Sequence, residues 1–294
     1  MKITVQPSFR ELTTLRLGGQ ARCLLVPQCD ADYEAIPREA ERYGGRLLAL
    51  GRGSNILAGD GEHDLALIRR PCLAAPRVVR TTSNKVLVAV DGGMTLAGLL
   101  AWCIKHECSG LEPLAGIPGS IGGAVAMNAG SHGCECFDLL QALRIWTPKD
   151  GVVWVDREIC RAGYRRFALQ GYDGVFAVLE ALLAFETCSR DVIRKRVKSW
   201  FVRKKSVQPL TAWTAGCAFK NPLNHSAGRL LDQAGLRGYA LGGMRFSPVH
   251  ANFLENTGKG TATQAFELMD LARETVAKRF GMVLEREVEV LECP

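Results

Sequence analysis

Short apolar runs alternate with segments in which apolar residues recur every three or four positions, and this pattern predicts a mixed α and β protein. The short runs are rich in branched aliphatic residues, as expected for buried strands, and the longer spaced segments are typical of helices with one buried face. The predicted strands cover residues 46–50, 85–90, 143–146, 152–155 and 176–184, and the first predicted helices cover 32–43 and 95–106, the second capped by Thr95.

Two further helices begin at residues that suit an N-cap. A helix is expected over 189–205, with Ser189 as its N-cap, and a shorter one follows Ser226 until Gly235 ends it in the left-handed conformation. The apolar stripe predicted for the first of them consists of Val192, Ile193, Val197, Trp200 and Phe201.

The last predicted helix starts at a capping-box pair, Thr261 and Gln264, and ends at Gly281. Its expected buried positions are Ala265, Met269, Ala272, Val276 and Phe280. A strand is predicted over 285–291, because charged and apolar residues alternate there, and this alternation would place Glu285, Glu287 and Glu289 on one face. A solvated face is the simplest interpretation of those three carboxylates.

The succession of elements predicts four parts of the chain. They are a first mixed lobe at residues 1–75, a second at 76–187, a linker helix at 188–205 and a third lobe at 206–294.

Composition and charge narrow the classes of protein. With 294 residues and 47% hydrophobic content the chain can bury a large core, and its net charge of +7 favours anionic partners. The chain has eleven cysteines, an odd number, and its first residues lack the pattern of a secretory signal. The cytoplasm is therefore the expected location. No paired C-x-x-C motifs predict a metal site, and no apolar run approaches the roughly 20 residues of a membrane span.

A glycine-containing loop follows the first predicted strand. Gly51-Arg52-Gly53-Ser54-Asn55 can offer successive backbone N–H groups to a phosphate, with two side chains as extra donors. The glycine spacing is not G-x-G-x-x-G, and the residues that follow do not open a helix, so a Rossmann fold is not indicated. An ordinary turn remains the alternative.

A second and denser glycine segment runs from Leu114 to Gly130. Four glycines fall within eight residues, beside a proline and a series of small apolar residues, which indicates that the backbone passes close to a ligand or to another backbone. Together with the first loop it would suit a dinucleotide diphosphate. Tight packing of small residues is the alternative.

In the third lobe, the segment 215–222 presents Cys217 within a turn of small residues, beside Lys220 and Asn221. An inert buried cysteine is the usual finding for any single cysteine, so the segment alone does not establish chemistry.

These segments, taken together and in this order, resemble the UDP-N-acetylenolpyruvoylglucosamine reductase family over nearly the whole chain. The motifs that carry the resemblance are TLRLGG at 14–19, GRGSN at 51–55, LEPLAGIPGSIGGAVAMNAG at 111–130, GYR at 163–165, QPL at 208–210, AGCAFKNP at 215–222, DQAGLRG at 232–238, SPVHANF at 247–253 and LEREV at 284–288.

The resemblance implies an α+β protein: a two-lobed FAD-binding fold of the vanillyl-alcohol oxidase type, in lobes 1–75 and 76–187, with a C-terminal α+β substrate-binding domain at 206–294. It implies the shorter class of the family, acting as a monomer on a UDP-sugar substrate with FAD as cofactor and NADPH as co-substrate. The residues implied to line FAD are Gly51, Gly53, Ser54, Asn55, Gly116, Gly119, Ser120, Gly122 and Gly123, and those implied near the substrate are Tyr164, Lys220 and Asn221.

The reaction implied by the resemblance is reduction of an enolpyruvyl group during peptidoglycan precursor synthesis. Hydride addition to C3 drives negative charge through C2 into the carboxylate, and Arg165 and Glu287 match the family positions that stabilise this charge. The family's proton donor to C2 is typically a serine, whereas this chain has Cys217. A thiol, with an ordinary pKa near 8.5, is a stronger acid than a hydroxyl, so we interpret Cys217 as a working replacement.

Two other classes of function compete with this one. A flavoprotein oxidising an alcohol or amine with oxygen would explain the first two lobes equally well, but not AGCAFKNP or Glu287. A nucleic-acid-binding module would use the basic segment 190–205, yet Trp200 and Phe201 fall on its predicted apolar stripe, and no nucleic-acid partner is expected. The solvated face of a helix is an alternative interpretation of most of that basic segment, and Arg203, Lys204 and Lys205 could attract the substrate's diphosphate.

Overall fold

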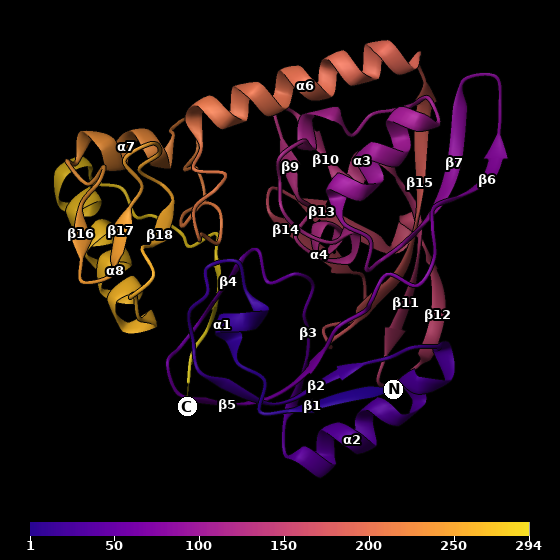
Figure 1. Cartoon of the computed structure of the whole chain (residues 1–294), viewed down its shortest axis with the longest axis horizontal. Coiled ribbons are helices and arrows are strands. Elements are labelled where there is room, and N and C mark those ends of the chain that lie inside the picture. The colour runs from indigo at the N-terminus through magenta and orange to yellow at the C-terminus, as the bar shows by residue number, and fades with distance from the viewer. Residues whose placement is uncertain (294) are drawn as a thin grey trace. The chain divides into compact units, whose positions relative to one another are not determined.

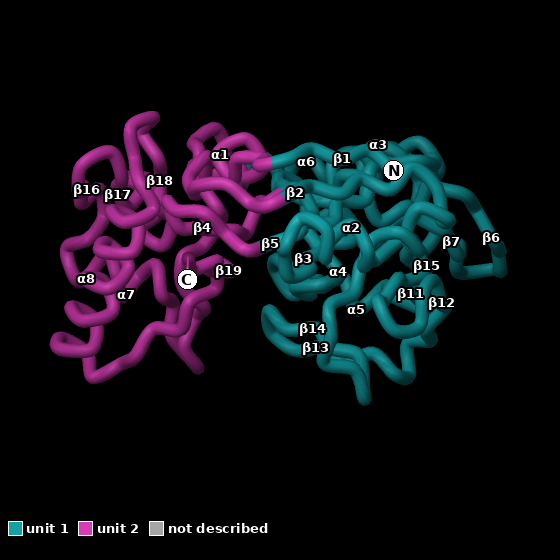
Figure 2. The backbone as a smooth tube through the Cα atoms, turned by 90° about the horizontal axis from the view of Figure 1, so that it is seen from below, with its two compact units in different colours: residues 1–5, 23–52, 65–203 teal, residues 6–22, 53–64, 204–294 magenta. Residues whose placement is uncertain are grey.

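The computed structural model describes residues 1–293 (Figure 1). The chain divides into two compact units, and it passes between them several times rather than once (Figure 2). Unit 1 comprises Met1–Val5, Cys23–Arg52 and Leu65–Arg203, and unit 2 comprises Gln6–Arg22, Gly53–Asp64 and Lys204–Pro294.

A four-stranded sheet near the start of the chain has the order β1-β2-β5-β3. Its strands are β1 (Lys2–Val5), β2 (Gln20–Val26), β5 (Glu62–Ile68) and β3 (Arg46–Ala49). The predicted strand at 46–50 is therefore confirmed. The helix predicted at 32–43 is a 3-10 helix, η1 (Asp30–Ala35), followed by α2 (Ile36–Tyr43). Pro37 lies in the first turn of α2, where a backbone N–H would have no partner within the helix. The α-helix therefore begins beside this proline and not at residue 32.

A larger sheet forms the body of unit 1. Its order is β12-β11-β15-β7-β6, with β8 paired to β15 (Figure 1). The strands are β12 (Gly151–Asp156), β11 (Leu140–Thr147), β15 (Ala177–Thr187), β7 (Lys85–Asp91), β6 (Arg77–Thr81) and β8 (Cys108–Ser109), and they confirm the four strands predicted between residues 85 and 184. Helices α3 (Leu96–Lys105) and α4 (Ile121–Ala126) contribute to the core on this sheet. Thr95 caps α3 as expected, accepting from the Gly98 N–H at 2.9 Å.

Short elements complete unit 1 between the long strands. They are η2 (Glu112–Leu114), β9 (Gly130–Ser131), β10 (Cys134–Glu135), α5 (Cys136–Leu139), η3 (Arg157–Ile159), β13 (Cys160–Gly163) and β14 (Arg166–Leu169).

Helix α6 (Arg190–Val207) corresponds to the helix predicted over 189–205. Its buried stripe is narrower than the predicted one. Ile193 is fully buried and Val197 and Trp200 pack against the core of unit 1, whereas Val192 and Phe201 are exposed. The spacing explains the error, because each exposed residue is the chain neighbour of a buried one and so points about 100° away from it.

Unit 2 packs two helices with a three-stranded antiparallel sheet. The strands are β16 (Ala240–Leu241), β17 (Met244–Phe246) and β18 (Leu254–Asn256), and the helices are α7 (Ala227–Gln233) and α8 (Ala262–Phe280), with the short α1 (Phe9–Leu12) and the parallel pair β4 (Ile56–Ala58) and β19 (Glu289–Leu291) beside them.

The caps predicted for the helices of unit 2 are present. The Ser226 side chain accepts from the Arg229 N–H, Thr261 and Gln264 form a capping box, and Gly235 and Gly281 are left-handed. Of the predicted core positions of α8, all are buried except the last, Phe280, which is half-buried.

The strand predicted over 285–291 is wrong in its first half. β19 begins only at Glu289. The backbone N–H groups of Glu287 and Val288 both point at the carbonyl oxygen of Ala218, at 2.9 and 3.5 Å, so the chain bends there instead of alternating. Consequently the three glutamates do not share a strand face: Glu285 and Glu289 are exposed, and Glu287 is half-buried.

Candidate active site

The two glycine loops meet in unit 1. A Cβ added to Gly51 would lie 2.7 Å from Oγ of Ser120, and one added to Gly123 would lie 4.0 Å from Cα of Gly51. A pocket lined by Gly51, Ser120, Gly122 and Gly123 extends between them. The absence of side-chain carbons is therefore what lets the two loops approach one another this closely.

A third glycine turn, Asp91-Gly92-Gly93, closes the pocket. The Gly122 N–H donates to the Gly92 carbonyl at 2.7 Å, and a Cβ at Gly92 would lie only 2.1 Å from the carbonyl oxygen of Val178 on β15. Gly92 and Val178 both line the pocket, so the turn after β7 and the start of β15 contribute to its wall.

The remaining predicted residues of the second loop shape its backbone. Gly116 and Gly119 have φ angles of +84° and +150°, which L side chains rarely adopt. Ser120 is buried and caps α4, accepting from the Gly123 N–H at 3.4 Å.

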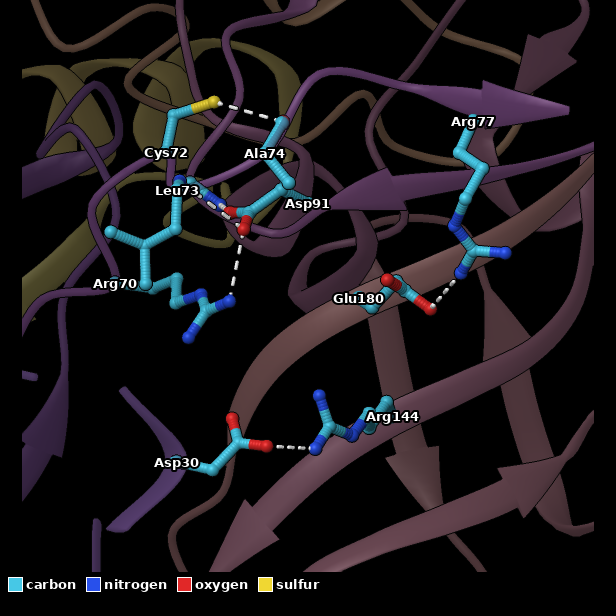
Figure 3. Close-up of polar contacts among 10 residues, drawn as sticks. Asp30, Arg70, Cys72, Leu73, Ala74, Arg77, Asp91, Arg144 and Glu180 are labelled. Atoms are coloured by element: carbon cyan, nitrogen blue, oxygen red, sulfur yellow. Dashed lines mark hydrogen bonds and ion pairs between the residues drawn. The ribbon is translucent and has the colours of Figure 1, made fainter. Parts of the chain in front are cut away.

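Arg70 brings a positive charge to this pocket (Figure 3). Its Nη2 donates to Oδ2 of Asp91 at 2.9 Å, and the two side chains are 13% and 3% exposed. Nε and Nη1 of Arg70 are buried without a hydrogen-bond partner among the described residues. Burial is the largest single effect and opposes the charge on the guanidinium, but the hydrogen bond and attraction to Asp91, together with the interaction with Tyr33, outweigh it, and the pKa of Arg70 is raised.

Asp91 holds this arrangement in place. Its Oδ2 also accepts from the Leu73 N–H at 3.3 Å, and its Oδ1 accepts from the Gly93 N–H at 2.8 Å. The carboxylate thus ties Arg70 to the third glycine turn. Sequence reasoning missed both residues; the only available signal was a pair of arginines directly after a buried strand.

The pocket fits a flavin dinucleotide. Glycine backbone can approach a diphosphate closely, and a fixed guanidinium with two nitrogens that lack a hydrogen-bond partner among the described residues suits an anionic partner. When bound, FAD would supply the hydride-transfer chemistry of a flavoprotein. Gly51, Ser120, Gly122, Gly123 and Arg70 line the pocket and would hold it.

The other predicted residues of the first loop belong to unit 2. Gly53 has φ +63°, and a Cβ there would lie 2.4 Å from the Leu12 carbonyl oxygen. Ser54 is half-buried beside it. The Asn55 side chain donates to the Glu287 carbonyl at 3.1 Å, and the Asn55 carbonyl accepts from the Glu289 N–H at 2.9 Å. Asn55 therefore links the loop to the predicted catalytic segment.

Arg165 sits in the turn between β13 and β14. Its φ of +55° is unusual for a residue with a side chain, which marks a position where the surroundings fix the backbone. Its Nη2 donates to the Gly130 carbonyl at 3.1 Å, and its guanidinium lies 4.9 Å from the ring centre of the exposed Tyr164. The buried Asn128 donates to the Gly163 carbonyl, which ties this turn to the second glycine loop.

In unit 2 the Cys217 turn and the Glu287 segment run side by side. The Glu287 N–H donates to the Ala218 carbonyl at 2.9 Å, and the Lys220 N–H donates to the Glu285 carbonyl at 2.9 Å. Cys217 is half-buried, so the structure does not show the fully buried cysteine that sequence reasoning kept as an alternative. The two predicted catalytic residues of this unit are therefore on paired backbones.

The predicted substrate residues of unit 2 have partners within the protein. Lys220 Nζ lies 3.2 Å from a carboxylate oxygen of Glu285, and Oδ1 of Asn221 accepts from the Ala227 N–H at 2.9 Å at the start of α7. Of the three basic residues at 203–205, Lys204 is buried and the other two are exposed.

Asn252 fixes the Cys217 turn from behind. The buried Asn252 side chain accepts from the Phe219 N–H at 3.0 Å and donates to the Phe219 carbonyl at 2.7 Å. The backbone carbonyl of Asn252 accepts from the Ala218 N–H. Sequence reasoning included it in a motif without assigning it a role.

Asn252→Ala is expected to lower the free energy of unfolding by about 1–3 kcal/mol, because it leaves two buried backbone groups unpaired. Urea denaturation of the two proteins measures the difference. Lys278→Ala, at an exposed position of α8, is the control and should change it by less than about 0.5 kcal/mol. An equal effect at both positions would contradict the role given to Asn252.

Among residues 1–293, no three His, Cys, Asp or Glu side chains are grouped so as to hold a metal ion. No helix in this part of the chain is long and apolar enough to cross a membrane.

The fold and the glycine pocket define the class of protein as an FAD-binding oxidoreductase. Residues 21–156 match the family described as FAD binding domain, and residues 208–291 match the C-terminal domain of UDP-N-acetylenolpyruvoylglucosamine reductase. The chain belongs to the UDP-N-acetylenolpyruvoylglucosamine reductase family. The fold class expected from the sequence is thereby confirmed.

Relatives and a solved structure match over the whole length. The UDP-N-acetylenolpyruvoylglucosamine reductase of Nitratidesulfovibrio vulgaris is 45% identical over 99% of both chains, and that of Oleidesulfovibrio alaskensis is 43% identical over 97% of this chain and 96% of the relative. The crystal structure of the enzyme from Thermus caldophilus, 30% identical, superposes with a TM-score of 0.83 and covers 99% of each chain. The match at 208–291 favours this family over the competing oxidase, because it lies outside the FAD-binding part.

Proposed function

We propose that this chain reduces the enolpyruvyl group of UDP-N-acetylglucosamine enolpyruvate to give UDP-N-acetylmuramate, with NADPH as the electron donor and FAD as the carrier. Membership of the family supports this, and the observation within the structure that carries it is the pairing of the Cys217 turn with the Glu287 segment. That pairing brings a proton donor and a carboxyl group onto neighbouring backbones.

FAD, when bound, would supply the hydride-transfer chemistry, with NADPH as the source of the electrons. The chain's own contribution is electrostatic and acid–base. Arg165 and Glu287 stabilise the negative charge that develops on the substrate carboxylate, in the manner of an oxyanion hole. Cys217 then delivers the proton from its thiol to C2.

The remaining assignments follow the same proposal. Lobes 1–75 and 76–187 hold FAD, the helix at 188–205 links them to the rest, and residues 206–294 bind the sugar nucleotide. Gly53, Ser54, Asn55, Gly116 and Gly119 complete the flavin-binding set. Tyr164, Lys220 and Asn221 contact substrate or nicotinamide, and one of Arg203, Lys204 and Lys205 attracts the substrate's diphosphate.

We also propose that the enzyme works in the cytoplasm as a monomer. Its two substrates are multiply charged small molecules that do not cross membranes unaided. The enzyme must therefore work in the compartment in which they are made.

Anaerobic titration with NADPH tests the assignment of electron donor. The purified protein should be yellow, and NADPH should bleach the flavin absorbance near 450 nm with a stoichiometry of one. An oxidase on the same scaffold would instead be bleached by an alcohol or amine and not by NADPH. Protein that takes up FAD but stays oxidised with NADPH would overturn the proposal.

A further inference from the structure

A cysteine and a histidine form a pair in unit 2 that the proposed reaction does not use. Sγ of Cys293 lies 3.3 Å from Nε2 of His63, and the Gly61 N–H donates to the same sulfur at 3.3 Å. Nε2 also lies 3.0 Å from the Gly59 carbonyl, which can only accept, so this nitrogen carries the proton. The sulfur therefore accepts a hydrogen bond from the Gly61 N–H and lies against the edge of an imidazole whose Nε2 proton also points at the Gly59 carbonyl.

The pair is reachable on the sulfur side only. His63 is 1% exposed and packs edge-on against Phe9, whereas Cys293 is half-buried. A nucleophile beside a fixed imidazole is the arrangement found at reactive thiols.

Burial makes several other thiols of the chain unreactive. Burial raises the pKa of Cys23 and Cys108 to about 11, and that of Cys136 to about 12. These groups stay protonated near neutral pH and react slowly. Cys29 is exposed and serves as the reference for an ordinary accessible thiol.

The sulfur of Cys293 is packed against two glycines. Cβ atoms added at Gly59 and Gly61 would lie 2.9 and 3.1 Å from Sγ. The sulfur therefore lies directly against this turn, and we expect a bulky group attached to it to displace the Cys293 side chain from the turn. The contact that holds the end of β19 would then be lost.

β19 connects this contact to the proposed catalytic segment. The strand pairs in parallel with β4, and the Gly59 N–H donates to the Leu291 carbonyl at 2.9 Å. At its other end the Glu289 N–H donates to the Asn55 carbonyl, and the Asn55 side chain donates to the Glu287 carbonyl. Loosening of β19 therefore reaches Asn55 and Glu287 within a few residues.

We propose that Cys293 is a site of reversible thiol modification by low-molecular-weight disulfides, and that its modification loosens β19 and slows the enzyme. The thiolate sulfur attacks one sulfur of the disulfide, and a new S–S bond forms to Cys293. The old S–S bond breaks, and its electron pair leaves on the second sulfur as a thiolate. Cys293 is oxidised, that half of the disulfide is reduced, and the thiol proton passes to solvent; excess free thiol reverses the exchange.

The experiment uses glutathione disulfide and the FAD-loaded full chain, with peptide mass spectrometry to follow each cysteine. Cys293 should form the mixed disulfide at least tenfold faster than Cys29. His63→Phe, which keeps an aromatic ring against Phe9, should slow Cys293 to the rate of Cys29 without changing Cys29. Equal rates at the two cysteines in the unaltered chain would overturn the proposal, whether or not the variant folds.

Hydrogen exchange tests the structural consequence independently of the reaction. In the modified protein the amides of Gly59 and Glu289 should exchange at least tenfold faster, and those in the middle of α8 should not change. Unchanged exchange at both amides would refute the coupling to β19.

The activity measurement rests on the proposed function. Turnover of the unaltered enzyme should fall severalfold after treatment with glutathione disulfide and recover with excess dithiothreitol. The same treatment should leave the turnover of Cys293→Ser unchanged. If Cys293→Ser loses activity equally, another thiol is responsible and the regulatory part fails. If the unmodified protein has no activity with NADPH and the enolpyruvyl nucleotide, the proposed function fails, while the mass and exchange measurements still decide the modification site.

Discussion

Cys217→Ala is expected to lower turnover by about 10²–10⁴-fold while NADPH still bleaches the flavin at the normal rate, because general acid catalysis contributes rate factors of this size. The alanine side chain cannot deliver a proton to C2, but it has no part in hydride transfer from NADPH. Stopped-flow absorbance of the two half-reactions separates the steps. Only the reoxidation of reduced flavin by the enolpyruvyl nucleotide should slow.

Cys217→Ser is the matched control, because serine keeps an O–H at the same position and is the residue typical of the family. It should retain useful turnover. The half-buried position of Cys217 and its place beside Ala218, which accepts from the Glu287 N–H, make a role in folding alone a poor explanation for a selective loss. An alanine variant with unchanged steady-state rates would contradict the assignment.

Arg70→Gln is expected to weaken FAD binding by about 10–100-fold, because charge-assisted hydrogen bonds contribute about 1.5–3 kcal/mol and each 1.4 kcal/mol corresponds to a factor of ten. The flavin should be lost on dialysis, and fluorescence titration measures the dissociation constant. Riboflavin, which has no phosphate, should bind both proteins alike if the guanidinium holds the diphosphate.

Arg77→Gln provides the control in the same unit. Arg77 lies 3.7 Å from Glu180 and its side chain is 64% exposed, so it is an arginine of ordinary surface character (Figure 3). Its substitution should leave FAD affinity unchanged. Equal losses of affinity in both variants would show a general effect of charge, and no loss in Arg70→Gln would remove Arg70 from the flavin site.

The elements that the sequence predicts well are those whose local signals agree with their packing. The strands of the large sheet and the caps Thr95, Ser226 and Thr261 are present as expected, because β-branched runs and capping side chains act over a few residues. The predictions that failed involve contacts far apart in sequence. Alternation around Glu287 predicts a strand, but bonds to Ala218, some seventy residues earlier, bend the chain.

The candidate site shows the same division. The glycine loops could be found from composition, because only glycine leaves the backbone uncovered. Arg70 and Asp91 could not, since nothing in the sequence indicates that strand β7 carries the carboxylate that fixes the arginine after β5. Cys293 and His63 are likewise 230 residues apart, and only the fold brings them together.

The most direct test is an anaerobic single turnover in which protein reduced with one equivalent of NADPH is mixed with UDP-N-acetylglucosamine enolpyruvate in deuterated water. We expect that absorbance near 450 nm returns within one turnover, and that UDP-N-acetylmuramate forms with deuterium at C2 of the lactyl group. Flavin that remains bleached, or that recovers without formation of this product, would contradict the proposed reaction.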